Sequence, residues 1–292
     1  MYTDFPKYPT AIFNDTDYPN QTDDVNIVYA ALVNALKEEL QACFDELGLL
    51  PKGDFASVSA RLLATETATR TRVAAPVSQW KMNDDEATSI VLDAGGKNNG
   101  VFTDTSGAIN TDTGSVTGKI NKGLELDGTD EFINIPNFNG LPSSQISLSA
   151  WVKIPTHKNY NRIIGHEWSG VGSWLVYIGS DGKPSFGIVQ CGGTSAVKSS
   201  LAVSVDVWAL ITCTYDGVLM KMYINGELTG TTDLDHASLD YIGSIEIGGN
   251  LSSPLDGVVD DVRIYDFGLI IGEVEALFKD ERGTEERTPL IE

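Results

Sequence analysis

The stretch Ser253-Pro-Leu-Asp-Gly-Val-Val-Asp-Asp-Val-Arg-Ile-Tyr-Asp266 decides the fold that the sequence predicts. Val258, Val262 and Ile264 share one parity, and the other parity is mostly polar. This alternation is typical of a strand with one buried and one wet face. Asp260 falls on the apolar parity. A carboxylate that faces a core needs backbone donors, a cation or a metal.

Length and charge limit the classes of protein to which this chain can belong. With 292 residues, of which 41% are hydrophobic, it can form one large β domain and a smaller part. The formal net charge of −21 repels nucleic-acid phosphate, so we expect no nucleic-acid partner. Calcium ions and basic protein surfaces suit such a charge better.

Cysteine usage and hydropathy narrow the expected compartment. Three cysteines give no disulfide framework, and Cys213 lies in an apolar strand pattern where it would pack as a small hydrophobe. No apolar run reaches the ~18 residues of a membrane span, so we expect no membrane partner. Residues 1–10 lack the basic and apolar regions of a secretory signal. We expect release by cell lysis; a signal removed from the sequence is the alternative.

The N-terminal region predicts an arm and a helix. Pro6, Pro9 and Pro19 exclude a continuous helix in residues 1–21, which form either a disordered tail or an arm that docks on a neighbouring subunit. A helix is predicted over 22–47, with Gly48 as its stop. Its apolar residues recur at steps of three and four and form one stripe. The stripe comprises Val25, Tyr29, Leu32, Leu36, Leu40, Cys43 and Leu47.

The stripe needs a partner, because an isolated helix cannot bury it. It can pack on a second short helix over 54–63, on copies of itself, or on the β domain. We predict a homo-oligomer. The expected organisation is an arm (1–21), a helical anchoring and oligomerisation module with its linker (22–76), a β domain (77–279) and a charged tail (280–292).

The β region resembles the laminin-G-like, concanavalin-type jelly rolls over residues 77–279. We expect the three tryptophans Trp80, Trp151 and Trp208 to lie in its core. The resemblance implies a mostly β fold, an antiparallel jelly-roll β-sandwich preceded by a small α-helical module. It does not imply one function, because this fold serves lectins, adhesion modules and glycosidases. The segments that carry the resemblance are Trp80, 93–100, 123–130, 146–153, 208–217, 221–226, 245–248 and 253–266.

The link after the long helix resembles the N-terminal region of tailed-phage structural proteins. The matching features are Leu47-Gly48, the turn Pro51-Lys-Gly53 and the segment Val58-Ser-Ala-Arg-Leu62. The run 18–24 lacks the histidine that the family often has there. The resemblance implies attachment to other virion proteins through the N-terminal region. By analogy with phage fibres it favours a trimer.

A calcium site is the first candidate for local chemistry. Asp93 begins a loop rich in Gly and Asn, and Asp260 lies in the closing strand. Oxygen-rich loops suit calcium. The resemblance implies a structural calcium ion held by Asp93 and Asp260. The alternative is that Asp260 accepts backbone N–H bonds and Asp93 closes a turn.

Sugar binding is the second candidate. Saccharides stack on aromatic rings and hydrogen-bond to polar side chains. Tyr160, His166 and Trp168 offer suitable groups, in segments that also hold mobile glycines. Trp168 can instead cap the edge of the sandwich. Trp174 is expected to begin a core strand.

Catalysis is the third candidate. The run Glu125-Leu-Asp-Gly-Thr-Asp130 echoes the Glu-x-Asp-x-x-Glu run of concanavalin-type glucanases, which need two carboxylates about 5–5.5 Å apart for retention. However, Asp127-Gly128 is more typical of a turn that ends a strand. We therefore expect no enzyme activity.

The sequence hypothesis is a virion structural protein, a head fibre or decoration protein or a tail-associated protein. It would lie on the virion surface and adhere to host glycans through its lectin-like domain. A non-viral secreted adhesion module is the alternative, and a glycosidase is the third hypothesis. The numbers and spacing of residues do not choose between attachment to head or tail.

Overall fold

The computed structural model describes residues 75–140, 144–166, 170–191, 193–234, 237–239, 243–249 and 253–283. The chain divides into two compact units, residues 1–64 and 65–292, and the described residues belong to the second. The predictions for the arm, the helix stripe and the linker lie outside the described residues. The boundaries of the β domain at residues 76 and 279 stay predictions.

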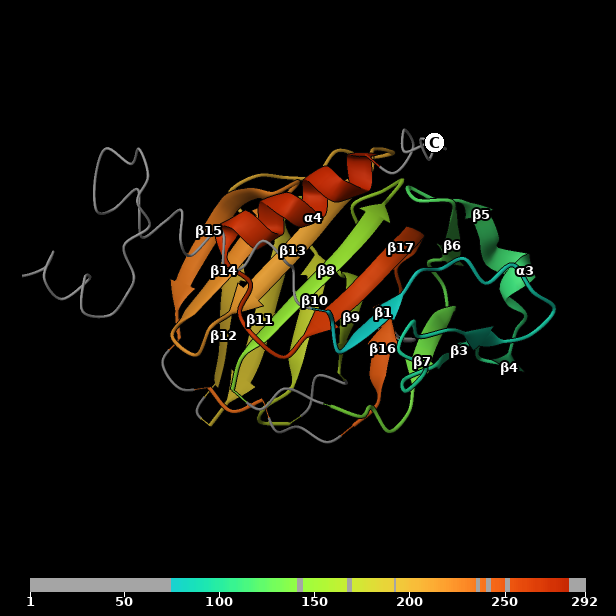
Figure 1. Ribbon diagram of the computed structural model, residues 1–292, viewed down its shortest axis with the longest axis horizontal. Coiled ribbons are helices and arrows are strands. Elements are labelled where there is room, and N and C mark those ends of the chain that lie inside the picture. The colour runs from blue at the N-terminus through green and yellow to red at the C-terminus, as the bar shows by residue number, and fades with distance from the viewer. Residues whose placement is uncertain are drawn as a thin grey trace, which may run out of the picture. The chain divides into compact units, whose positions relative to one another are not determined.

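Two antiparallel sheets pack face to face and confirm the predicted β-sandwich (Figure 1). We call the first of them sheet A. Across the described part of this sheet the order is β15 (Glu227–Asp233), β14 (Leu219–Ile224), β13 (Ala209–Tyr215), β8 (Ile146–Lys153), β17 (Asp256–Tyr265), β6 (Lys122–Asp127) and β5 (Ser115–Thr117), with β1 (Ser78–Trp80) beside β17.

Sheet B forms the second layer, behind sheet A in Figure 1. Its described strands run in the order β12 (Gly193–Lys198), β11 (Pro184–Gln190), β10 (Trp174–Ile178), β9 (Asn161–His166), β16 (Ile245–Ile247), β7 (Phe132–Ile135), β3 (Gly100–Asp104) and β2 (Ile90–Val91), with β4 (Gly107–Ala108) beside β3. A single-turn helix, α3 (Thr111–Gly114), connects the two sheets through β5.

The core lies between the sheets and follows the alternation of the strands. In β8, Ile146, Leu148, Ala150 and Val152 face this core, so every second residue is apolar. The same core contains Trp80 and Trp174, and Trp174 begins β10 as predicted. Cys213 of β13 packs there as a small hydrophobe, also as predicted. Burial of this alternating set fixes the register of the central strands.

A second apolar cluster lies on the opposite, outer face of sheet A. The helix α4 (Ile271–Gly283) covers this face in Figure 1, and the sequence reasoning did not predict it. Trp151 belongs to this outer cluster rather than to the core between the sheets, and Trp208 packs at its margin with a half-buried side chain. The cluster is formed by Trp151, Leu210, Tyr223, Tyr265, Leu269, Val274 and Leu277.

Polar contacts hold the start of α4 against the sheet. The hydroxyl of Ser147 on β8 donates to the carbonyl of Phe267 at 2.8 Å and accepts from the N–H of Leu269 at 2.8 Å. The Glu273 carboxylate accepts from the N–H of Ile270 at 2.9 Å, which caps the first turn. No helix in the described residues is both long and apolar enough to cross a membrane.

A β-bulge in β17 corrects the predicted alternation of the closing strand. The pairing with β8 shifts between Asp260 and Arg263, and Asp261 adopts a left-handed φ of 45°. Val259 and Val262 therefore both face the core, on either side of the bulge. Asp260 pairs with Trp151 and points to the outer face, not to the core between the sheets as its parity predicted.

Candidate functional site

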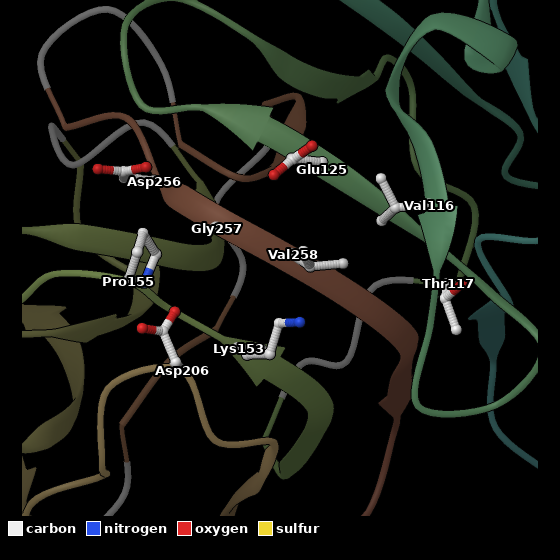
Figure 2. A pocket seen from close by; sticks show the side chains of 9 residues that line it. All are labelled: Val116, Thr117, Glu125, Lys153, Pro155, Asp206, Asp256, Gly257 and Val258. Atoms are coloured by element: carbon white, nitrogen blue, oxygen red, sulfur yellow. The ribbon is translucent and has the colours of Figure 1, made fainter.

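A cavity of about 340 Å³ opens on the outer face of sheet A, beyond the part that α4 covers (Figures 1 and 2). The residues that line it come from β5, β6, β8 and β17, from the loop between β8 and β9, and from the loop between β12 and β13. They are Val116, Thr117, Glu125, Lys153, Pro155, Asp206, Asp256, Gly257 and Val258.

Strand register places opposite charges on either side of an apolar side chain in this cavity. Val258 of β17 pairs with Glu125 of β6 on one side and with Lys153 of β8 on the other. All three side chains point away from the core, as their lining of the cavity and Figure 2 show. Neighbouring strands are about 4.8 Å apart, so Glu125 and Lys153 start about 10 Å from each other. Val258 forms an apolar floor between them.

Close packing of β17 on β8 shapes one end of the cavity. Gly257 has a φ of 143°, and a Cβ added to it would lie 2.4 Å from the carbonyl oxygen of Lys153. A side chain at this position would therefore push the two strands apart. The neighbouring Asp256 is fixed by Lys158, whose Nζ lies 3.1 Å from its Oδ2, and by the hydroxyl of Thr156 at 3.3 Å.

Asp206, in the loop that precedes β13, forms another side of the cavity. Its backbone N–H donates to the carbonyl of Ile154 at 2.8 Å, and this bond brings the loop against Pro155. Asp206 itself adopts a left-handed φ of 56°, a conformation that Asp tolerates better than most residues. The bond thus positions a carboxylate from a distant segment opposite β6.

The charges of the cavity are only partly compensated. Glu125 and Asp206 make no ion pair and no side-chain hydrogen bond within the described residues. The ammonium group of Lys153 lies 5.6 Å from the ring centre of Trp208, in a cation–π contact that holds it at the margin of the cavity. The cavity therefore presents hydrogen-bond acceptors, one donor and an apolar floor to a small polar ligand.

Two of the predicted sugar-contacting residues, Tyr160 and His166, lie apart. Tyr160 is about half exposed and its ring packs on Tyr177, with centroids 5.1 Å apart. His166 ends β9 and lies about 20 Å from Tyr160 along the strand, at ~3.3 Å per residue. Trp168 lies outside the described residues. Neither Tyr160 nor His166 lines the cavity on sheet A.

His166 is buried and serves the core. Its ring packs edge-on against Trp174 at 4.8 Å, and its Nδ1 lies 3.2 Å from the carbonyl oxygen of Ser244. Burial lowers the pKa of His166 to about 4, so the ring is neutral near pH 7. Its inaccessible position gives no support to a role in ligand contact.

Sequence reasoning missed most of the cavity, although it singled out Glu125 for another reason. The segment 146–153 was singled out only for its resemblance to the jelly rolls, and in the structure Lys153 at its end points outward. A sequence pattern does not give the register, which places Lys153 and Glu125 on either side of Val258. Asp206 comes from a loop, for which no periodic signal exists.

The run that resembles a glucanase motif ends in a turn, as predicted. Asp127 Oδ1 accepts from the N–H groups of Thr129 at 2.8 Å and Asp130 at 3.3 Å, and Gly128 has a φ of 70°. The carboxylates of Glu125 and Asp127 both point outward on β6, but only Glu125 lines the cavity. Asp127 acts as the cap of the turn between β6 and β7.

Asp93 closes its own loop through backbone donors. Its Oδ1 accepts from the N–H of Gln79 at 3.0 Å, and its Oδ2 accepts from the N–H groups of Lys97 and Asn98, both at 3.1 Å. The loop in turn supplies the carbonyl of Asn98, which accepts from the indole N–H of Trp80 at 2.8 Å. The carboxylate therefore anchors β1 and the core tryptophan.

Asp260 is buried in a different environment. Its Oδ2 accepts from the N–H of Ile120 at 2.7 Å, whereas its Oδ1 has no hydrogen-bond partner among the described residues. Burial raises the pKa of Asp260 to about 7, the nearby charge of Asp261 adds to the rise, and the bond from Ile120 opposes it. Lys119 of the same loop lies over the ring of Trp151 at 5.3 Å.

The two predicted calcium ligands do not fit a common ion. Asp93 and Asp260 accept from different loops, and both oxygens of Asp93 already receive N–H bonds. No group of three or more His, Cys, Asp or Glu side chains that could hold a metal occurs in the described part of the chain. Calcium usually takes six to eight oxygen ligands. A calcium ion at Asp93 and Asp260 stays a prediction that this geometry does not support.

Residues 127–274, about half of the chain, match the Concanavalin A-like lectin/glucanases superfamily, in its laminin-G type. The chain belongs to this superfamily. A search of the curated proteins finds no match. The superfamily holds both lectins and glucanases, so membership establishes the jelly-roll fold and leaves the activity open.

Solved structures of similar fold include one domain of an arabinanase and two toxin binding domains. Domain 4 of AbnA, a GH43 extracellular arabinanase from Geobacillus stearothermophilus solved with arabinotriose, is 20% identical with a TM-score of 0.56, over 69% of this chain and 97% of that one. The binding domain of Paraclostridial Mosquitocidal Protein 1 is 19% identical with a TM-score of 0.56, over 70% of this chain and 52% of that one.

The ligand-binding domain of botulinum neurotoxin serotype D, solved with N-acetylneuraminic acid, is 20% identical with a TM-score of 0.53, over 70% of this chain and 50% of that one. The chain thus spans about half the length of the two toxin domains. At these identities the likeness is one of fold.

Replacing Asp93 tests whether its carboxylate serves the backbone or a metal. We expect Asp93→Ala to lower the free energy of unfolding by about 2–4 kcal/mol, because buried N–H groups lose their acceptor. Urea unfolding should give the same loss with and without a calcium chelator. Asp112→Ala, at an exposed site on α3, is the control and should change little. A chelator that destabilises the parent but not Asp93→Ala would instead establish a bound calcium ion.

The buried carboxylate of Asp260 should make the stability of the domain depend on pH. Its folded pKa is above its unfolded value near 3.8, so the folded state holds the proton more tightly. The contribution of Asp260 to stability should therefore be fully present below about pH 4 and be lost as the pH rises from about 4 to about 7. We expect Asp260→Asn to flatten this decline and to gain about 2 kcal/mol at pH 8 by thermal unfolding.

Asp266→Asn, at an exposed position after the same strand, serves as the matched control and should leave the pH profile unchanged. If Asp260→Asn is less stable than the parent at pH 8, the carboxylate has a cationic partner and the assignment of its charge is wrong.

Proposed function

We propose that the β-sandwich is a glycan-binding, lectin-like domain whose binding site is the cavity on the outer face of sheet A. The observation that carries this proposal is the row Glu125–Val258–Lys153, in which polar groups flank an apolar floor inside a cavity. Sugars present both hydroxyl groups and apolar C–H faces, so they need this combination. Membership of the superfamily supports the same class of ligand.

Each side of the cavity has a role in this proposal. The carboxylates of Glu125, Asp206 and Asp256 accept hydrogen bonds from hydroxyl groups, and the Lys153 ammonium donates to ring or hydroxyl oxygens. Val258 and Pro155 contact the C–H face of the sugar. Small-molecule sites have volumes of about 300–1,000 Å³, and 340 Å³ lies at the lower end. A short terminal saccharide therefore fits better than the middle of a long chain.

For the whole chain we propose a structural protein of a virus particle, a head fibre or decoration protein or a tail-associated protein. The support is the resemblance of the link Leu47–Leu62, after the predicted long helix, to the N-terminal region of tailed-phage structural proteins. In this proposal residues 1–76 attach to other virion proteins and assemble the chain as a homo-oligomer, with a trimer favoured. Several copies on the virion surface would raise a weak affinity for host glycans by avidity.

Two alternatives differ in observable ways. A secreted adhesion module of a cell would have a signal in its full-length gene. A glycosidase would release reducing sugar from a polysaccharide and would lose this activity in Glu125→Gln, because Glu125 is the carboxylate of the glucanase-like run that lines the cavity. Asp127, the second carboxylate of that run, is bound to the N–H groups of its own turn. We therefore favour binding without catalysis.

Removing the one ammonium group that lines the cavity tests the glycan site. We expect Lys153→Met to weaken binding of the full chain to a neutral glycan by about tenfold, as for loss of a charge-assisted hydrogen bond. A glycan panel followed by calorimetry measures this effect. Lys97→Met, at an exposed position in the Asp93 loop, should bind like the parent. A panel of neutral, amino and acidic glycans with no binder would refute the proposed function.

The location of the chain tests the virion proposal. We expect antibodies against the sandwich to label the surface of purified particles in electron microscopy. We also expect a truncation that lacks residues 1–76 to be absent from particles. Particles that lack the parent chain would contradict a structural role in the virion without affecting the glycan site.

A further inference from the structure

We infer that the cavity on sheet A selects glycans that carry free amino groups, such as oligomers of glucosamine, over N-acetylated and acidic glycans. This inference names the ligand class of the proposed glycan site and rests on that proposal. It follows from which charges around the cavity are already compensated and which are not.

The carboxylates outnumber the ammonium groups around the cavity. Asp256 is paired with Lys158 at 3.1 Å, so its charge is largely used. Glu125 and Asp206 have no such partner within the described residues, and Lys153 is held above the ring of Trp208. An ammonium group of a ligand can therefore pair with Glu125 or Asp206 without displacing an existing ion pair.

The positions of these carboxylates suit a ligand with more than one amino group. In Figure 2, Glu125 and Asp206 lie on opposite sides of Val258 and Lys153, and Asp256 closes a third side. A sugar ring over Val258 can thus direct a substituent to either carboxylate. An N-acetyl group at the same position carries no charge and adds volume to a cavity of only about 340 Å³.

The net charge of the whole chain also favours glycans that carry amino groups. A net charge of −21 attracts cationic oligosaccharides and repels anionic ones before contact. Dissolved salt screens this long-range effect within about 10 Å at 0.1 M. Preference that remains at moderate salt must therefore come from the side chains of the cavity.

Calorimetry of the full chain with three hexasaccharides tests the inference. The probes are a hexamer of glucosamine, a hexamer of N-acetylglucosamine and a hexamer of galacturonic acid, in moderate salt. At about pH 6, where amino groups are charged, we expect the glucosamine hexamer to bind about tenfold more tightly than the N-acetylated one. The acidic hexamer should bind most weakly. The preference should disappear at about pH 9, where the sugar amine is neutral.

Variants connect this preference to the cavity. We expect Glu125→Gln and Asp206→Asn each to weaken binding of the glucosamine hexamer several-fold more than binding of the N-acetylated hexamer. Asp233→Asn is the matched control, because this carboxylate lies on β15 at the opposite edge of sheet A. Equal weakening by all three variants would mean non-specific attraction to an acidic chain and would overturn the inference.

The two proposals fail in different ways. If the N-acetylated hexamer binds as tightly as the glucosamine hexamer and Lys153→Met weakens both, the glycan site stands and the inference about amino groups is wrong. If none of the hexamers binds and no glycan of the panel does so, the proposed function itself is wrong and the inference falls with it.

Discussion

The packing of β17 is the constraint on which the rest of the described structure depends. This strand lies between β8 on one side and β6 and β1 on the other, so it joins the N-terminal and C-terminal strands of sheet A. The bulge at Asp261 lets it bury Val259 and Val262 on one face while Val258 and Asp260 face outward. One irregular residue thus determines both the core contacts and the outer cavity, because side chains alternate strictly on either side of it.

Much of the fold could be predicted from the sequence. The resemblance to jelly rolls included the segment 146–153, which forms β8, Trp174 was expected to begin a core strand, and Asp127-Gly128 was expected to form a turn. Asp260 was assigned to the wrong face of the sheet, because the sequence gives no sign that Asp261 adopts a left-handed conformation and interrupts the alternation of the strand. The helix α4 had a readable signal in the spacing of Val274, Leu277 and Phe278, three and four residues apart.

The site was less predictable than the fold for a physical reason. A cavity on a sheet face consists of neighbours across strands, and their proximity depends on register, which a sequence pattern does not state. Glu125 and Lys153 are far apart in the chain and become neighbours only through Val258. The side chains predicted to contact sugars were chosen by residue type alone, without knowledge of their burial, and His166 is buried in the interior. Local sequence patterns were therefore sufficient to predict the fold class. The binding surface depends on long-range strand pairing, which they do not give.

The position of α4 has a consequence for how the domain is made. This helix is the last described element of the chain, yet it covers Trp151 and Tyr265 on the outer face of sheet A. During synthesis the two sheets can assemble before residues 271–283 have left the ribosome, and an aromatic surface then stays open to water. A nascent or truncated chain at that stage is a natural client for chaperones. Completion of the helix is what ends this period of vulnerability to aggregation.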